Sequence, residues 1–323
     1  MIILFMFLGL LALVLINVPI AVALAVVASA AMVFAHGPDV LPNVALVMMD
    51  GATNFPLIAI PLFILAGSIM NSTGISRRLI AFASAIFGFV KGGLAMVNIG
   101  TSLFFAEISG SAVADVAALG SILIPSMKKK GYPAPFAAAV TSSSATLAVI
   151  IPPSIPMILY AVMAQSSVVQ LFVAGIVPGV LGGFLMMVVA HRFAVHYNYP
   201  VEEVFKVSQV VSTFKDAALA FTLPLIILGG IFGGFVTATE GAGLAVVAAM
   251  VIGAIYRELD WPHLKQAMID GSVQTAVVML LVASSVLIGE YLTEAQVPQT
   301  LADGIGNITQ NKYFVLALLN LFF

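Results

Sequence analysis

The sequence predicts an all-α polytopic membrane protein, and three observations lead to this fold class. Hydrophobic residues make up 62 % of the 323 residues and charged residues only 8 %, whereas a soluble domain carries about 25 % charged residues. Long runs of the chain are free of charge, among them residues 1–35, 51–76 and 131–190. Segments of about 10 residues with alternating polarity, the mark of an outer-membrane barrel, are absent from the sequence. Helices of roughly 20 apolar residues are the remaining way to satisfy the backbone in lipid.

The apolar spans can be placed along the chain from their breaks. Asn17 and Pro19 interrupt the first span, so it should be a long tilted helix or a broken one. Two connectors read as interfacial helices, 36–54 and 257–270, the second with Trp261 at the headgroup level. The expected spans are 1–35, 55–72, 79–92, a broken pair over 93–127, 134–165, 168–192, 217–235, 239–256, 272–293 and 311 onward.

The charges also exclude several classes of protein. The net charge is −2, so nothing favours a nucleic-acid partner. The chain has no cysteine, which excludes a disulfide framework and a thiolate metal site. The N-terminus lacks a basic region and a cleavage site, so residues 1–35 are interpreted as structural and not as a signal peptide. Lys128-Lys129-Lys130 and the connector 191–215 are rich in positive charge and are predicted to be cytoplasmic.

An internal repeat runs through the chain. The segment LAVVA at 24–28 recurs at 244–248, and Asp50-Gly51 recurs as Asp270-Gly271 at the same offset of 220. Three further matches follow at an offset of 222, namely Gly67 with Gly289, Leu79 with Leu301, and Asn98 with Asn320. Weak internal repetition is typical of secondary transporters, often with inverted topology.

The repeat predicts how the chain is organised. We expect first-repeat scaffold helices and an interfacial arm over 1–92, and a hairpin with a broken helix over 93–165. A connecting helix and cytoplasmic linker follow over 166–215, and a second repeat covers 216–323. The first copy continues past Asn98 and the second stops just after Asn320. The natural chain is therefore expected to continue for about 75–100 residues, with a second hairpin and a second broken helix.

The first segment with potential chemistry surrounds Ser109-Gly110-Ser111. Glu107 and Asp115 flank it within apolar surroundings, and acidic residues inside a membrane usually mark function. Serine and glycine destabilise a continuous helix, so a helix–break–helix hairpin with its tip at 109–111 fits. Such a tip offers oxygen ligands to a small cation and helix N-termini to a carboxylate. The alternative is a face of small residues that packs against another helix.

The second segment is Thr141 to Pro156. Four consecutive hydroxyl residues precede the Pro152-Pro153-Ser154 break inside a span without charge. Each proline removes a donor and frees a carbonyl four residues earlier. Unwound backbone at membrane depth is tolerated where it lines a cavity, so the break is a candidate cation site facing the hairpin tip. A simple proline kink, with serines bonded to their own helix, is the alternative.

A third segment, 236–243, has a simpler explanation. Thr239 is predicted to cap the following helix, with Glu240 favourable in its first turn. Thr237, Thr239 and Glu240 stay weaker candidates for an ion or substrate site, as does Glu107. No pair of histidines is spaced on one helix face to bind a metal.

These features together resemble the large membrane subunit of TRAP transporters, the tripartite ATP-independent periplasmic family. The resemblance covers essentially the whole chain. One departure is Ala238, where the usual TATE-type motif has proline. The motifs that carry it are ISGSAVAD with GSILIP (108–125), IIPPSIPMILYA (150–161), LPLIILGG (223–230) and FVTATEGAG (235–243).

The resemblance implies a fold and a function. The fold would be an inverted-repeat elevator-type transporter with a re-entrant hairpin and proline-broken helices, multi-pass in the bacterial inner membrane. Such proteins use a sodium gradient to import a small organic anion such as sialic acid or a C4-dicarboxylate. Their partners are a small four-helix membrane subunit and a periplasmic substrate-binding protein. Sodium is the only metal implied, with no organic cofactor and no catalytic residue.

The resemblance also implies the residues of the site. One sodium site and part of the substrate site would be lined by the tip, the hydroxyl run and the break: Ser109, Gly110, Ser111, Asp115, Ser143, Ser144, Thr146, Ile151, Pro152, Pro153 and Ser154. An intramembrane serine protease is an alternative, but it needs a base near the nucleophile, and every histidine lies near the end of a span. A channel is another alternative, although the repeat and the broken segments favour alternating access.

Overall fold

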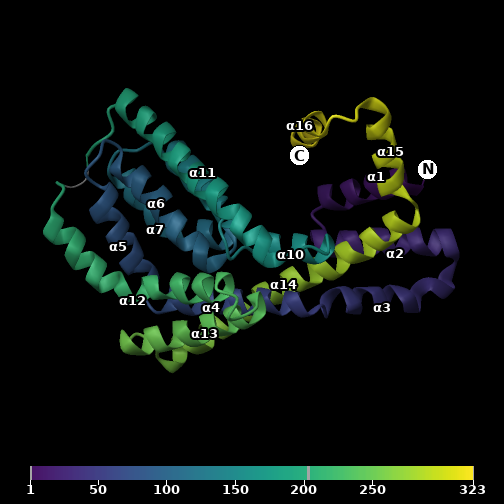
Figure 1. Ribbon diagram of the computed structural model, residues 1–323, viewed down its shortest axis with the longest axis horizontal. Helices are drawn as coiled ribbons and strands as arrows, with labels where there is room; N and C mark the ends of the chain where they lie inside the picture. The colour runs from purple at the N-terminus through teal and green to yellow at the C-terminus, as the bar shows by residue number, and fades with distance from the viewer. Residues whose placement is uncertain (1, 202–203, 323) are drawn as a thin grey trace. The chain divides into compact units, whose positions relative to one another are not determined.

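The computed structural model describes residues 2–201 and 204–322, without the side chains of residues 107–109, 114, 308 and 322. Helices and turns, with no strand, make up these described ranges, which confirms the all-α fold class. Contacts divide the chain into two compact units (Figure 1). Unit 1 is Met1–Thr53 with Ala276–Phe323, and unit 2 is Asn54–Thr275. The four segments expected from the repeat stay a prediction.

Unit 1 takes its helices from both ends of the chain. The expected interruption of the first span is confirmed, because one helix ends at Leu15 and the next begins at Ile20, directly after Pro19. Asn17 lies between them with a left-handed φ of 66°. The elements of this unit are α1 (Ile2–Leu15), α2 (Ile20–His36), η1 (Pro38–Val40), α3 (Leu41–Ala52), the second part of α14 (Trp261–Glu294), α15 (Val297–Ile308) and α16 (Lys312–Phe322).

Unit 2 holds the segments with potential chemistry. Within the described residues of the whole chain, five helices are long and apolar enough to cross a membrane, or six when one bent pair is counted as a span. That bent pair contains the expected proline break. The elements of unit 2 are η2 (Phe55–Ile58), α4 (Ala59–Ser72), α5 (Ile75–Phe87), α6 (Gly93–Ser109), α7 (Ala112–Lys129), α8 (Ala134–Ala145), α9 (Leu147–Ile150), α10 (Ile155–Met163), α11 (Val168–His196), α12 (Val207–Phe232), α13 (Ala238–Ile255) and the first part of α14.

The prediction of a separate interfacial helix over 257–270 is wrong. Helix α14 is continuous from Trp261 to Glu294 and includes the expected boundary at Gly271. A Cβ at Gly271 would lie at ordinary contact distance, 3.5 Å, from the Cα of Leu65 in α4, so packing does not require glycine there. A single glycine costs a helix only about 1 kcal/mol relative to alanine, and the helix continues through it. The sequence also missed helix α15, which falls between the expected spans 272–293 and 311 onward.

The two copies of the repeat exchange contacts. The LAVVA segments lie in α2 and α13, and the positions around Gly67 and Gly289 lie in α4 and α14. In unit 2, α4 of the first copy packs on α13 of the second. In unit 1, Leu287 and Tyr291 of α14 share a buried cluster with Val27 of α2. In each pairing, a helix of the first copy contacts a helix of the second copy that is not its counterpart in sequence.

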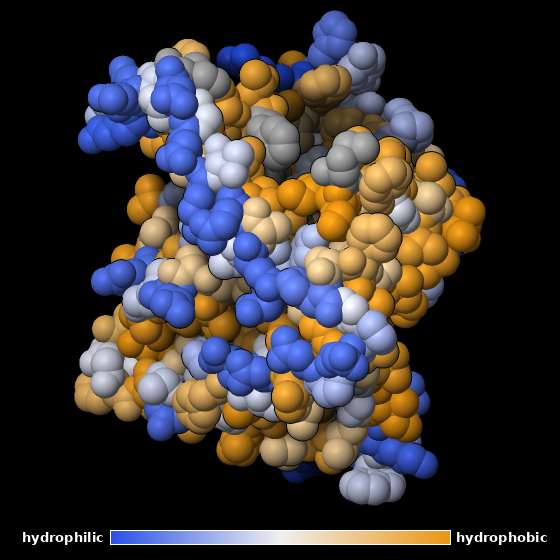
Figure 2. Space-filling view, turned by 90° about the vertical axis from the view of Figure 1, so that its right-hand side faces the viewer, coloured by the Kyte–Doolittle hydropathy of each residue, from blue (hydrophilic) through white to orange (hydrophobic). Residues whose placement is uncertain are grey.

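Small residues and exposed apolar side chains fit a bilayer environment. Helices α4 and α13 pack on each other, and Ala66, Gly67, Ala245 and Ala249 are among their buried residues. Small residues let helix backbones approach closely in lipid, where the hydrophobic effect does not drive helix association. Hydrophobic residues cover much of the face of the molecule drawn in Figure 2, and Phe34 is 81 % exposed. Such surfaces are expected on helices that contact lipid.

Candidate functional site

The predicted hairpin is present in unit 2. Helices α6 and α7 are separated by two residues, Gly110 and Ser111. The Asn98 side-chain nitrogen, in the second turn of α6, lies 3.8 Å from the sulfur of Met127, in the last turn of α7. The two helices therefore run antiparallel, and Figure 1 shows them side by side. A continuous crossing through 95–127 is excluded by this contact. The hairpin begins and ends at the same end of the bundle, where Lys128 lies.

The tip of the hairpin contacts the proline break. Gly110 has a left-handed φ of 57°, a conformation that glycine adopts without strain. Its carbonyl accepts a hydrogen bond from the backbone N–H of Ile155 at 3.3 Å. A Cβ at Gly110 would lie 2.8 Å from the carbonyl oxygen of Pro153, so only glycine fits at this distance. The sequence expectation that the tip faces the break is confirmed by these two contacts.

The break itself follows from proline chemistry. Pro153 has no N–H to bond the carbonyl of Val149, four residues earlier. The hydroxyl of Ser154 donates to that carbonyl instead, at 2.6 Å, and accepts from the N–H of Met157 at 3.4 Å. Ser154 is thus the N-cap of α10, fully buried. The segment before the break and α10 are bent by 42°, which fits two half-helices and not a straight span.

A buried neutral network sets the depth at which the two segments meet. The amide of Asn98 donates to the hydroxyl of Thr141 at 2.7 Å, and the hydroxyl of Ser102 donates to that of Ser144 at 2.9 Å. The Ser144 hydroxyl also donates to the side-chain amide oxygen of Asn98 at 3.4 Å. All four side chains are buried. These bonds hold α6 and α8 parallel and in register. The chain after α6 therefore reaches Gly110 at the same depth in the bundle as the chain after α8 reaches Pro152 and Pro153.

The sequence reasoning missed this network as a unit. Thr141 and Ser144 were noticed as part of a hydroxyl run, and Asn98 only as a position of the repeat. The available signal was the spacing of Asn98 and Ser102, which are four residues apart and therefore share one face of α6. A polar pair on one face of an apolar helix predicts a polar partner on the neighbouring helix.

The structure brings together some of the predicted site residues and separates others. Gly110, Pro153 and Ser154 lie at the tip–break contact. Asp115 is fully buried in the first turn of α7, and Ser111 is half-buried beside the tip.

The hydroxyl run points in several directions. Ser144 faces α6, whereas Ser143 lines an apolar groove of about 450 Å³ whose lining residues come from α6, α8 and α11. Thr146 is exposed and donates to the carbonyl of Ser143 at 2.6 Å. Of the remaining predicted residues, Ile151 and Pro152 belong to the break, while the side chains of Glu107 and Ser109 lie outside the described part of the chain.

The predicted cap at Thr239 is wrong by two residues. Thr237 is the N-cap of α13, and it forms a capping box with Glu240. The hydroxyl of Thr237 accepts from the Glu240 N–H at 3.2 Å, and the Glu240 carboxylate accepts from the Thr237 N–H at 2.7 Å. The box needs a spacing of three residues, which Thr239 and Glu240 lack. Thr239 instead lies within 3.5 Å of the Phe55 carbonyl in η2.

Four helix ends meet at the tip–break contact. Helices α6 and α9 end there, at Ser109 and Ile150, and helices α7 and α10 begin there, at Ala112 and Ile155. A helix C-terminus presents free carbonyls and partial negative charge, while a helix N-terminus presents free N–H groups and partial positive charge. One place can therefore offer oxygen ligands to a cation and donors to a carboxylate.

Comparison with known proteins identifies the family. Residues 7–323 match the family model described as "Tripartite ATP-independent periplasmic transporter, DctM component". Among curated proteins, "Uncharacterized protein YgiK" of Salmonella typhimurium is 40 % identical over 275 residues, which are 85 % of this chain and 63 % of that protein.

Two further relatives have names that state a substrate. The "C4-dicarboxylate TRAP transporter large permease protein DctM" of Pseudomonas aeruginosa is 36 % identical over 295 residues, 91 % of this chain and 69 % of the relative. The "Sialic acid TRAP transporter large permease protein SiaM" of Vibrio cholerae is 36 % identical over 275 residues, 85 % of this chain and 64 % of the relative. The chain thus spans about two thirds of the length of these three relatives. It belongs to the DctM component family of the tripartite ATP-independent periplasmic transporters.

Proposed function

We propose that this chain is part of the large membrane subunit of a sodium-coupled secondary transporter that imports a small organic anion. The observation that carries the proposal is the contact between Gly110 and the Pro153–Ile155 segment. It joins two interrupted helices of unit 2 at one point. Interrupted helices whose ends converge are how secondary transporters bind an ion and an anionic substrate together.

The proposed roles follow from the polarity of the helix ends. Sodium is small and hard, so several carbonyl or hydroxyl oxygens would surround it. The carbonyl ends of α6 and α9 supply such oxygens, and Ser111 and Asp115 at the start of α7 are further candidates. The N-termini of α7 and α10 favour a carboxylate by about 0.3–1 kcal/mol each at exposed sites. Sodium binding would order the tip and build the adjacent anion site, so the two ligands would enhance each other's affinity, typically by about 5–150-fold.

The substrate class and partners come from the family. The relatives named above transport, by their names, a C4-dicarboxylate in one case and sialic acid in the other. We propose the same class, a small organic acid, delivered by a periplasmic binding protein. A small membrane subunit would pack on the static helices, within 1–35 and 55–92. The protein would cross the bacterial inner membrane several times. The hairpin and the broken helix would move together in an elevator motion.

The test is a sodium titration of uptake. The full-length protein, with its small subunit and binding protein, is reconstituted in proteoliposomes, and uptake of sialic acid or succinate is measured against sodium concentration. Ser111→Ala is expected to raise the sodium half-saturation severalfold, because one oxygen beside the tip is lost. Ser126→Ala is the matched control, since that serine is half-buried near the other end of α7 and its hydroxyl bonds its own helix, at the carbonyl of Ile122.

Three outcomes would contradict parts of the proposal. If Ser111→Ala keeps the wild-type sodium half-saturation and rate, the placement of sodium at the tip is wrong. If a proton gradient drives uptake equally well without sodium, the coupling ion is wrong. If the complete wild-type complex takes up neither acid, the substrate class is wrong.

A further inference from the structure

The turn that precedes the proline break depends on its neighbours for its position. Helix α9 consists of only four residues, Leu147–Ile150. Pro152 and Pro153 have no N–H, so neither can donate to the carbonyl four residues earlier, at Ala148 or Val149. A single helical turn with so few hydrogen bonds is not stable by itself. Contacts with other helices must therefore fix where the end of α9 lies.

Helix α11 lies directly against this turn. Gly175 of α11 faces the carbonyl oxygen of Ile150, and a Cβ at Gly175 would overlap that oxygen. One turn later, a Cβ at Gly179 would overlap the Cγ1 atom of Ile151, the first residue of the break. Both glycines are buried. A methyl group at either position would have to displace α11, the break, or both.

The same face of α11 also contacts the hairpin. Gly183 lies four residues after Gly179, so the two share one face of the helix, and a Cβ at Gly183 would lie 2.7 Å from the Cδ2 atom of Leu103 in α6. Helix α11 contacts α6 along its length and α10 near its start (Figure 1). It therefore touches both halves of the tip–break contact and can fix the position of one relative to the other.

Gly182 provides a comparison within the same helix. Its Cβ would lie 3.5 Å from the Cδ2 atom of Leu147, which is an ordinary contact distance, although Leu147 belongs to the same short helix α9. Alanine fits at position 182, and it is a better helix former than glycine. The need for glycine is thus particular to the positions that approach the break most closely, and it is not a general property of α11.

We propose that Gly175 and Gly179 are positioning residues for the cation site at the tip–break contact. They act by lacking a side chain, which lets α11 hold the end of α9 against the tip of the hairpin. The inference rests on the proposed sodium site and adds to it two residues of a neighbouring helix. The groups of a binding site must be held within about 0.5 Å of the productive geometry. A Cβ that overlaps a backbone oxygen forces a displacement larger than this.

The experiment measures uptake by the complete reconstituted complex against sodium concentration, with sialic acid or succinate at saturation. Gly175→Ala and Gly179→Ala are each expected to raise the sodium half-saturation about tenfold, the lower end of the range for residues that orient metal ligands. The maximal rate at saturating sodium is expected to change less. Gly182→Ala is the matched control on the same helix and should keep the wild-type half-saturation.

A double-mutant cycle tests the contact itself. Ile151→Ala removes the Cγ1 atom that the methyl of Gly179→Ala would meet. The effects of the two substitutions on sodium half-saturation are therefore expected to be less than multiplicative in the double variant, because residues in contact are coupled. The methyl of Gly175→Ala meets a backbone oxygen, which no side-chain substitution removes. If that variant does not fold, the cycle between positions 179 and 151 decides alone.

The outcomes that would overturn the inference are distinct. A lower melting temperature with an unchanged sodium half-saturation would assign the glycines to packing alone. An equal rise for Gly182→Ala would show that any substitution on α11 has the same effect, and multiplicative effects in the cycle would show that the contact is not the cause. A wild-type complex without sodium dependence would overturn the proposed sodium site and this inference with it. Normal sodium dependence of the wild type with unaffected variants would overturn this inference alone.

Discussion

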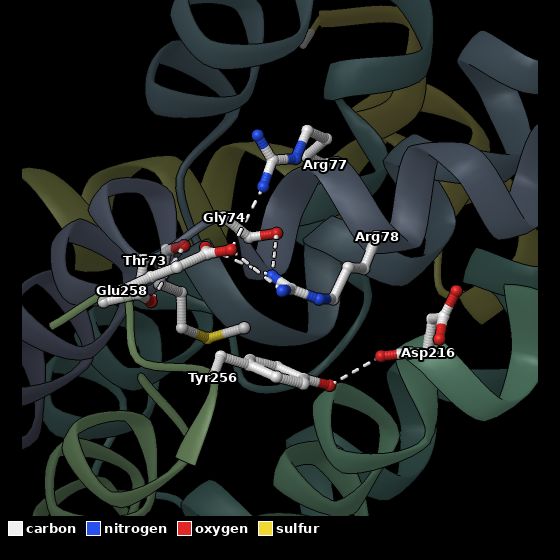
Figure 3. A network of polar contacts seen from close by, with 8 residues as sticks. Thr73, Gly74, Arg77, Arg78, Asp216, Tyr256 and Glu258 are labelled. Atoms are coloured by element: carbon white, nitrogen blue, oxygen red, sulfur yellow. Dashed lines mark hydrogen bonds and ion pairs between the residues drawn. The ribbon is translucent and has the colours of Figure 1, made fainter. Parts of the chain in front are cut away.

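Two networks join helices of unit 2 in opposite surroundings: the neutral network between α6 and α8, and the ionic cluster in which Arg77 and Arg78 of α5 bind Glu258, which follows α13 (Figure 3). Asn98, Thr141 and Ser144 are completely or almost completely buried and carry no charge. Arg78 and Glu258 keep 20 % and 28 % of their side chains exposed. Neutral groups can be buried fully once they are hydrogen-bonded, whereas an ion pair loses much solvation energy on burial. We propose that the hairpin moves. The described side-chain hydrogen bonds between its helix α6 and the neighbouring α8 all join neutral groups.

The largest expected effect comes from the neutral network. Asn98→Leu removes a donor to Thr141 and an acceptor for Ser144 in a buried site. The free energy of unfolding is expected to fall by about 1–3 kcal/mol, the cost of leaving buried polar groups unsatisfied. Thermal or chemical denaturation of the full-length protein in detergent measures it. Asn307→Leu, on exposed α15, is the matched control, and an equal effect of both variants would contradict the assigned role.

The ionic cluster is expected to contribute less and to depend on pH. Glu258→Gln should lower the unfolding free energy by about 1 kcal/mol, near the upper end for exposed ion pairs. The hydrogen bond from Arg78 lowers the pKa of Glu258 below its ordinary value of 4.5. A lowered folded-state pKa gives stability that is present above pH 4.5 and lost as the pH falls through the folded-state value.

This pH dependence separates the two networks. The difference in melting temperature between wild type and Glu258→Gln should shrink as the pH falls below 4.5, while that for Asn98→Leu should stay constant. A Glu258→Gln difference that persists unchanged in acid would show that packing, and not charge, carries its contribution.

The smallest effect on stability is expected for Arg77→Gln. The side chain is largely exposed and shares its acceptor with Arg78, so the unfolding free energy should change by less than about 0.5 kcal/mol. Chemical denaturation of this variant measures the change, and a loss as large as that of Glu258→Gln would contradict the minor role assigned to Arg77.

Backbone chemistry made much of the fold predictable. Asn17 with Pro19, Gly110 with its serines, and the Pro152-Pro153 pair each interrupt an apolar run, and each marks a real break between helices. Local residue types decide such breaks, because proline removes a donor and glycine adopts left-handed φ. The contact between two breaks followed from the rule that unwound backbone in a membrane must face a partner or a cavity.

The errors had more than one cause. Gly271 stands between the expected interfacial helix and the next expected span, yet α14 continues through it, because a single glycine costs a helix only about 1 kcal/mol. Helix α15 was missed because it is a short amphipathic helix of 12 residues, without the continuous apolar run by which the other spans were recognised. Asn98, Arg77 and Glu258 gained their meaning only from partners 43 to 181 residues away. Sequence spacing could suggest a polar face at Asn98, but it could not name Thr141 as the partner.

The contact between Gly110 and Ile155 offers the most direct test of sodium binding at the tip. The Ile155 amide donates to the Gly110 carbonyl, so its hydrogen exchange reports on the closure of the two breaks. Exchange in the complete protein is compared by mass spectrometry in sodium and in potassium at equal ionic strength. The account predicts that sodium slows exchange in peptides covering 107–115 and 150–157 and leaves 255–262 unchanged. Equal exchange of the tip and break peptides in the two salts would contradict sodium binding between them.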